Sequence, residues 1–146
     1  MCIRDRGAKW SEIDFKKKIW TIPAERMKGK IEHVVPLTPS VLKILKFVKM
    51  LKTSDYVFPG AREGRPLSNM SMNMLLRRMG VENAIVHGFR SSFRDWCGDQ
   101  TQYPREIAEA ALAHKVGNKV EQAYRRRSAL EKRGELMADW SLYCAN

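Results

Sequence analysis

Three side chains suited to binding phosphate lie close together along one short stretch of the sequence. His87, Arg90 and Arg94 are three and four residues apart, so on a helix at about 100° per residue they fall within about 60° of one another. Each arginine offers a planar fork of hydrogen-bond donors, and the histidine adds another donor. This face could therefore hold a phosphate group, although a basic face that only contacts solvent would show the same spacing.

Another face of the same expected helix is aromatic. Phe89, Phe93 and Trp96 also fall within about 60° of one another. The pattern predicts a helix over residues 88–99 that buries its aromatic stripe in the core and presents the histidine and the arginines together.

A second histidine and a tyrosine follow downstream. His114 precedes Tyr124 by ten residues, and Arg125 and Arg126 come directly after the tyrosine. A single histidine is usually structural, and a single tyrosine on a helix is usually half-buried in the core. The two residues by themselves therefore leave a structural role open for both.

The elements that must position these residues begin with a small sheet. Two segments rich in β-forming residues, at residues 9–15 and 19–23, are separated by a basic turn. Residues 27–30 form a polar turn that contains a glycine, and residues 33–37 predict a third strand. The sequence thus predicts a three-stranded antiparallel sheet, which needs a helical layer over its apolar face.

Helical spacing begins after the third strand. Thr38 followed by Pro39 predicts the start of a helix, and Ser68 is expected to cap the next one, which ends at Gly80. The apolar residues expected to face inward are Val41, Leu45, Val48 and Leu51 in the first helix and Met70, Met74 and Leu75 in the second. Later helices are expected over residues 88–99, 104–112, 120–127 and 129–143.

The charge balance favours a partner rich in phosphate. The chain has 27 lysines and arginines against 16 aspartates and glutamates, a net charge of +11. Residues 1–52 hold 13 basic and 5 acidic groups, whereas residues 53–146 hold 14 and 11. A strongly basic segment beside a balanced one favours nucleic acid, and a basic surface that serves only solubility is the alternative.

Other broad classes of protein fit the sequence poorly. No apolar run is long enough to span a bilayer, the first residues lack the apolar stretch of a signal peptide, and a location in the bacterial cytoplasm, at the nucleoid, is expected. The basic residues do not line one face of a hydrophobic helix, which argues against a membrane surface. Three scattered cysteines suggest neither a disulfide framework nor a zinc site.

In combination, these motifs resemble the signature of tyrosine recombinases. The resemblance lies in HGFR at residues 87–90, in His114, and in Tyr124 followed by an arginine. Four longer stretches look like the prophage and satellite-phage branch of integrases: WSEID at 10–14, IWTIPAERMKGK at 19–30, HVVPL at 33–37 and ALEKRGELMADW at 129–140. The resemblance covers the chain from Lys9 onward and implies a mainly α fold with a small three-stranded antiparallel sheet, an α+β catalytic domain.

The resemblance implies a role for each candidate residue. Tyr124 would attack a DNA phosphorus and form a 3′-phosphotyrosine, and Arg90 would stabilise the charge of the pentavalent transition state. His87 would assist proton transfer, and His114 would donate a further hydrogen bond to the phosphate. Lys28, in the turn before the third strand, would protonate the departing 5′-oxygen.

Lys28 is preferred to Lys30 as the general acid because it lies eight residues before Pro36, the spacing shown by the family. Without the resemblance, ordinary solvation of a turn would explain both lysines. The further residues expected to contact DNA are Lys30, Arg94, Arg125 and Arg126. No metal or other cofactor is needed, because arginine, histidine and lysine supply the positive charge.

The resemblance fails at the amino terminus. The family has another arginine that the spacing to Trp10 would place at position 1, where this chain has methionine, and Arg6 occupies a nearby but non-catalytic position. We therefore expect a partial, amino-terminally truncated catalytic domain, with a non-native start at residues 1–8, a sheet at residues 9–37 and a helical part at residues 38–146. Alone, the chain is expected to be inactive or nearly so in recombination.

The expected partners are duplex DNA at attachment sites and, for a full-length protein, further copies in a tetramer. The final helix, with Leu136, Met137 and Trp140, could pack on a neighbouring protomer or on its own core. Two other functions remain open: a catalytically inactive DNA-binding remnant or regulator of integrase sites, and a basic RNA-binding protein. The RNA-binding alternative explains the charge but not the spacing of histidine, arginine and tyrosine.

Overall fold

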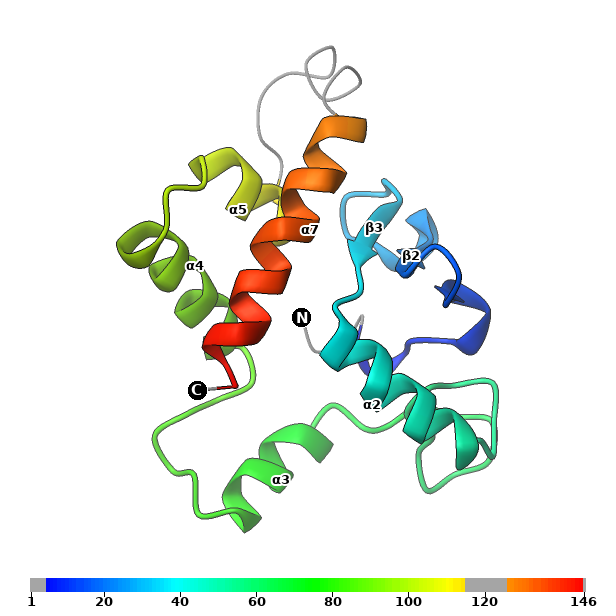
Figure 1. Cartoon of the computed structure of the whole chain (residues 1–146). Helices are drawn as coiled ribbons and strands as arrows, with labels where there is room; N and C mark the ends of the chain where they lie inside the picture. The colour runs from blue at the N-terminus through cyan, green and yellow to red at the C-terminus, as the bar shows by residue number, and fades with distance from the viewer. Residues whose placement is uncertain (1–4, 115–125, 146) are drawn as a thin grey trace.

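The computed structural model describes the backbone of residues 5–114 and 126–145 and the side chains of residues 5–114 and 129–145. Figure 1 shows the order of the elements along the chain. They are the 3₁₀ helix η1 (Trp10–Glu12), β1 (Ile13–Asp14), β2 (Ile19–Ile22), the 3₁₀ helix η2 (Ala24–Arg26), β3 (His33–Pro36), α2 (Pro39–Met50), α3 (Ser71–Arg78), α4 (Gly88–Gln100), α5 (Arg105–Ala111) and α7 (Arg126–Tyr143). The predicted fold class, mainly α with a three-stranded antiparallel sheet, is confirmed.

The sheet has the order β1-β2-β3, with both pairs antiparallel. Trp20 in the central strand lies opposite Ile13 on one side and Val35 on the other. The first strand is much shorter than the predicted residues 9–15. Glu12 causes this shortening, because its carboxylate accepts hydrogen bonds from the Lys9 backbone at 3.2 Å and from Trp20 Nε1 at 2.9 Å, which closes a tight turn.

Helix α2 begins as the sequence predicts, but only part of its expected apolar face is covered: Leu45 is buried and Val48 packs against the same core. The Thr38 hydroxyl accepts a hydrogen bond from the backbone N–H of Val41 at 3.4 Å, and proline occupies the first turn. Leu42 and Leu45 are buried, whereas Val41 and Leu51 are exposed, which corrects the prediction for both. The buried leucines pack in a core with Leu37 and Val57 under the sheet, so the position of the sheet decides which face is covered.

Helix α3 was expected to turn three apolar residues inward, and it does not. Met70, Met74 and Leu75 are all exposed. Ser68 contacts the Ser71 hydroxyl at 2.9 Å instead of capping the backbone. The long segments on either side of α3 carry it away from the other helices (Figure 1), so none of the elements that the structure describes covers its apolar side. Gly80, with φ +72°, follows the helix as predicted.

A second core joins α4, α5 and α7. Its buried members are Phe93, Trp96, Cys97, Ile107, Ala108 and Leu136. Trp140 packs against this cluster, with its ring centroid 5.1 Å from that of Trp96 and 5.4 Å from that of Phe93. The apolar side of the final helix therefore packs on its own core. Phe89 is exposed, contrary to the predicted stripe, because it lies in the first turn of α4 before the contact with α5 and α7.

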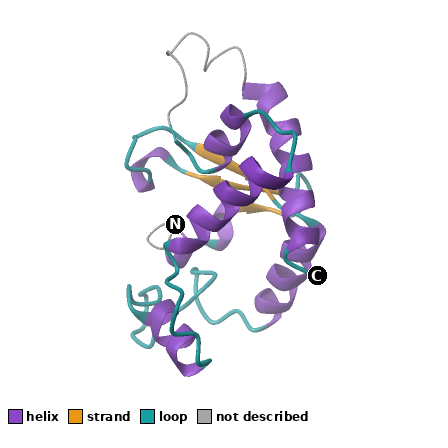
Figure 2. Ribbon diagram, turned by 90° about the vertical axis from the view of Figure 1, so that its left-hand side faces the viewer, coloured by secondary structure: helices purple, strands orange, loops and turns teal. Residues whose placement is uncertain are grey.

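A buried arginine connects this helical core to the sheet. Arg133 in α7 donates from Nη1 to the carbonyl of Val34 in β3 at 2.9 Å and from Nε to the carbonyl of Ala129 at 3.2 Å. Burial lowers the pKa of the Arg133 guanidinium. Because α7 lies against β3 (Figures 1 and 2), this side chain fixes the helix that follows residue 124 relative to the strand that follows the lysine turn.

Two further expectations concern helices. The helix expected over residues 120–127 lies mostly outside the described part of the chain, because residues 115–125 are not described. Its last two residues fall in α7, which begins at Arg126. Among the described helices, none combines the length and the apolar character that a membrane crossing requires.

Candidate active site

Arg90 and His114 meet although 24 residues separate them. Arg90 lies in the first turn of α4, and its Nη2 atom is 2.6 Å from Nε2 of His114. The same nitrogen donates to the backbone carbonyl of Leu112 at 2.9 Å. Because a guanidinium has only donors, Nε2 of His114 accepts this hydrogen bond and the proton of the neutral imidazole resides on Nδ1.

The end of α5 places His114 at this point. The N–H of His114 donates to the carbonyl of Glu109 at 2.9 Å, and the N–H of Ala113 donates to the carbonyl of Ala110 at 3.1 Å. These two hydrogen bonds form a Schellman motif, in which Ala113 adopts the left-handed conformation with φ +57°. The motif turns the chain back over the last turn of the helix, so the imidazole faces the side chain of Glu109.

We expect Ala113→Gly to stabilise the fold by about 1 kcal/mol, because glycine adopts the left-handed conformation without the steric cost of a Cβ atom. Ala110→Gly, within the same helix, should instead destabilise by about 1 kcal/mol. The free energy of unfolding in urea measures both changes. A loss of stability in Ala113→Gly would contradict the strain described here.

Glu109 is the centre of a charged cluster that sequence reasoning missed. Its carboxylate accepts a hydrogen bond from Nδ1 of His114 and lies 3.1 Å from Nε of Arg94 and 3.9 Å from Nε of Arg105. Its side chain is only 13% exposed. The available signal was weak: Arg105 and Glu109 are four residues apart on a helix, a spacing that also occurs in ordinary surface pairs.

The pKa of Glu109 lies below its ordinary value of 4.5, chiefly because His114 donates a hydrogen bond to the carboxylate. The charges of Arg94 and Arg105 also lower the pKa, and burial opposes them. A lowered pKa in the folded state means that the carboxylate stabilises the fold above pH 4.5. This contribution is lost as the pH falls through the lowered value.

The other two residues of the predicted basic face, His87 and Arg94, lie at the N-cap of α4 and within α4. His87 is exposed and directly precedes the helix, and its carbonyl accepts from the N–H of Arg90 at 3.2 Å. Arg94 is half exposed and pairs with Glu109. The predicted contacts of Arg94 with DNA would therefore compete with this ion pair.

The two lysines of the predicted turn lie on the sheet side of the molecule, between η2 and β3. Lys28 and Lys30 are exposed, and the buried side chain of Met27 anchors the start of the turn. Lys30 adopts φ +52°, and its N–H donates to the carbonyl of Met27 at 3.0 Å. The turn is thus as predicted, and the approach of Lys28 to a phosphate bound at Arg90 stays a prediction.

Tyr124 and Arg125 lie outside the described residues, and Arg126 is described only as the first residue of α7. The segment that carries them starts directly after His114 and ends where α7 begins. The roles of these three residues stay predictions.

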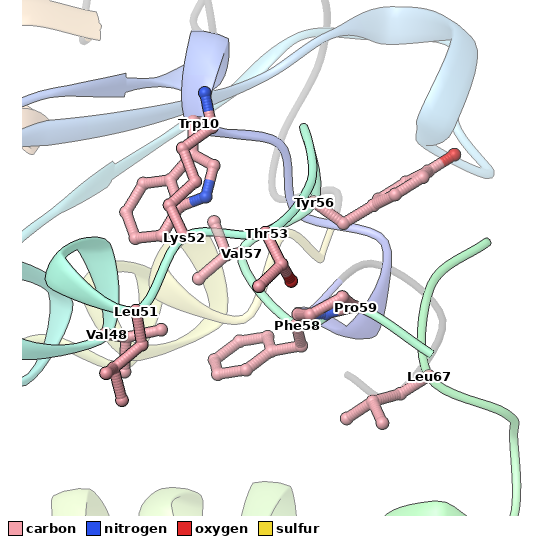
Figure 3. Close-up of a pocket in the computed structure, with 10 residues that line it drawn as sticks. All are labelled: Trp10, Val48, Leu51, Lys52, Thr53, Tyr56, Val57, Phe58, Pro59 and Leu67. Atoms are coloured by element: carbon pink, nitrogen blue, oxygen red, sulfur yellow. The ribbon is translucent and has the colours of Figure 1, made fainter. Parts of the chain in front are cut away.

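A pocket of about 240 Å³ lies elsewhere, between η1, the end of α2 and the following loop (Figure 3). Its lining is mostly apolar and includes Trp10, Val48, Leu51, Phe58 and Leu67. Because lysine supplies its only charged lining group among the described residues, the pocket does not provide the forked donors that a phosphodiester needs.

The sequence matches known integrases over nearly its whole length. The profile of the phage integrase family matches residues 6–131. Prophage integrase IntA of Escherichia coli K12 is 37% identical over 137 residues, which cover 92% of this chain and 33% of that protein. The integrase of Shigella phage Sf6 is 31% identical, covering 93% and 36%, and that of Enterobacteria phage P4 is 32% identical, covering 94% and 36%.

No solved structure matches the chain at a significant level. The chain spans about a third of the length of the curated relatives it matches. The family profile nevertheless covers the sheet, the HGFR motif at residues 87–90, His114 and the start of the final helix. The chain belongs to the phage integrase family.

Proposed function

We propose that the chain forms the catalytic part of a site-specific recombinase, which cuts and rejoins duplex DNA through a 3′-phosphotyrosine intermediate. The observation that carries the proposal is the contact of Arg90 with His114, 2.6 Å apart. Two groups that can donate hydrogen bonds to one phosphate meet there, and the segment that leads to Tyr124 begins directly after His114. Membership of the integrase family supports the same chemistry.

The proposed reaction assigns one task to each group. The phenol oxygen of Tyr124 attacks the phosphorus, the bond to the 5′-oxygen breaks, and Lys28 supplies the proton to that leaving oxygen. Arg90 and His114 bind the non-bridging oxygens and stabilise the added negative charge, while His87 accepts the proton that the phenol of Tyr124 loses. The phosphotyrosine conserves the energy of the phosphodiester, so a second DNA end can reverse the step.

A nicked suicide substrate tests this proposal. The nick releases a short strand after cleavage, so the covalent protein–DNA adduct cannot be reversed and accumulates even when cleavage is slow. We expect adduct with the unchanged chain and none with Tyr124→Phe. Tyr143→Phe, which removes a hydroxyl from the exposed end of α7, is the matched control and should form adduct normally.

Other outcomes would contradict the proposal. Adduct that persists in Tyr124→Phe would exclude this tyrosine as the nucleophile. DNA binding without adduct, both for this chain and for the chain extended by any in-frame sequence before residue 1, would favour the inactive DNA-binding protein. Preference for structured RNA over duplex DNA would favour the RNA-binding alternative.

A further inference from the structure

Glu109 binds Nδ1 of the His114 imidazole, the ring nitrogen that does not contact Arg90. The carboxylate accepts the proton of His114 Nδ1, and His114 Nε2 accepts from Arg90. Carboxylate, imidazole and guanidinium thus form one chain of hydrogen bonds. In the described part of the protein, the contact of Nδ1 is with this carboxylate, so Glu109 decides which ring nitrogen carries the proton and which one faces Arg90.

Glu109 is itself fixed from two helices. Arg94 approaches it from α4 at 3.1 Å, and Arg105 lies one turn earlier on α5 at 3.9 Å. The low exposure of the carboxylate, 13%, strengthens these interactions relative to those of a solvated pair. The ion pair of Arg94 with Glu109 therefore joins α4, which carries Arg90, to α5, whose end leads to His114.

We propose that Glu109 is a positioning residue of this site, an inference that rests on the proposed recombinase function. It holds the His114 ring with Nε2 directed to the phosphate side. A phosphate oxygen only accepts hydrogen bonds, so His114 must carry a proton on both ring nitrogens when it donates to the phosphate. The second proton makes the imidazole positive, and the positive charges of Arg90, Arg94 and Arg105 nearby disfavour this. The negative carboxylate of Glu109 offsets their effect.

The first test is spectroscopic and needs no activity. In nitrogen-15 spectra of the histidine rings, the unchanged chain should show His114 with its proton on Nδ1, in slow exchange with water because Glu109 accepts it. Glu109→Ala should lose this signature. Glu109→Gln, whose amide oxygen can still accept from Nδ1, should retain it, and thermal unfolding of each variant checks that the fold persists.

The second test measures cleavage of the suicide substrate in a single turnover at saturating DNA. By analogy with partners that orient metal-bound histidines, Glu109→Ala should cleave about 10–100-fold more slowly while its affinity for DNA changes little. Glu109→Gln should recover part of the rate. Glu131→Ala removes an exposed carboxylate from α7 and should change neither the spectrum nor the rate.

The possible failures differ. If Glu109→Ala keeps the His114 signature, or cleaves as fast as the unchanged chain, this inference is wrong and the proposed function stands. If no variant forms adduct, and neither the unchanged chain nor the chain extended by in-frame sequence before residue 1 does so, the proposed function is wrong and the inference that rests on it is wrong too.

Discussion

Replacing Arg90 with alanine should slow cleavage of a suicide DNA substrate by about 10²–10³-fold, the loss expected when one preorganised donor to a developing oxyanion is removed. The guanidinium is already held in place, because its Nη2 atom donates to Leu112 and contacts His114. Arg90→Lys should lose most of the rate as well, since a single ammonium group cannot reproduce the planar fork of donors.

The measurement is the single-turnover rate of adduct formation at saturating DNA. Arg78→Ala, at the exposed end of α3, removes the same charge far from the proposed phosphate and is the matched control. We expect this control to change the rate little. A loss below tenfold in Arg90→Ala would contradict this role of the guanidinium. An equal loss in Arg78→Ala would show that charge alone explains the effect.

The second large effect concerns the core that holds the site. Leu136→Ala should reduce the free energy of unfolding by about 3 kcal/mol, within the range of about 2–5 kcal/mol for buried leucines. Leu136 is 0% exposed in the cluster that joins α4, α5 and α7. Because these helices carry Arg90 and Glu109, loosening the cluster should also weaken the contact of Arg90 with His114.

Leu142 offers a matched control on the same helix. It is 67% exposed, so Leu142→Ala should cost less than about 0.5 kcal/mol. Unfolding in urea, followed by circular dichroism, measures both variants. Equal costs for the two leucines would contradict the burial described for α7.

Local patterns predicted most elements, because turns, caps and periodicity act over a few residues. Thr38 before a proline marked the start of α2, and Gly80 marked the end of α3. The errors occurred where distant residues decide. Residues 10–12 form a 3₁₀ helix and not part of the strand predicted over residues 9–15, because Glu12 contacts Trp20 and Arg26, eight and fourteen residues away.

Burial was predicted less well than helix formation. Periodicity identifies an apolar face, but only the packing of the whole chain decides whether another element covers that face. Met74 and Phe89 show this limit, since both lie on expected apolar faces and both are exposed. Phe93 and Trp96, which the same reasoning selected, are buried because α5 and α7 lie against them.

The candidate site was predictable in part. Spacing placed His87, Arg90 and Arg94 on one helical face, and the resemblance to recombinases implied that His114 joins them. Arg90 and His114 do lie in contact, while the role of each residue at a phosphate stays a prediction. Glu109 could not be predicted, because its partner Arg94 is fifteen residues away on another helix and the turn at Ala113 brings His114 back to it.

Identification of the residue joined to DNA is the most direct test of the proposed chemistry. The adduct is trimmed with nuclease, digested with trypsin and analysed by mass spectrometry. The expected product is the peptide of residues 120–125, VEQAYR, bearing a nucleotide through the phenol oxygen of Tyr124, which is its only hydroxyl side chain. A nucleotide attached to any other residue, such as Tyr103 or Tyr143, would contradict the proposed mechanism.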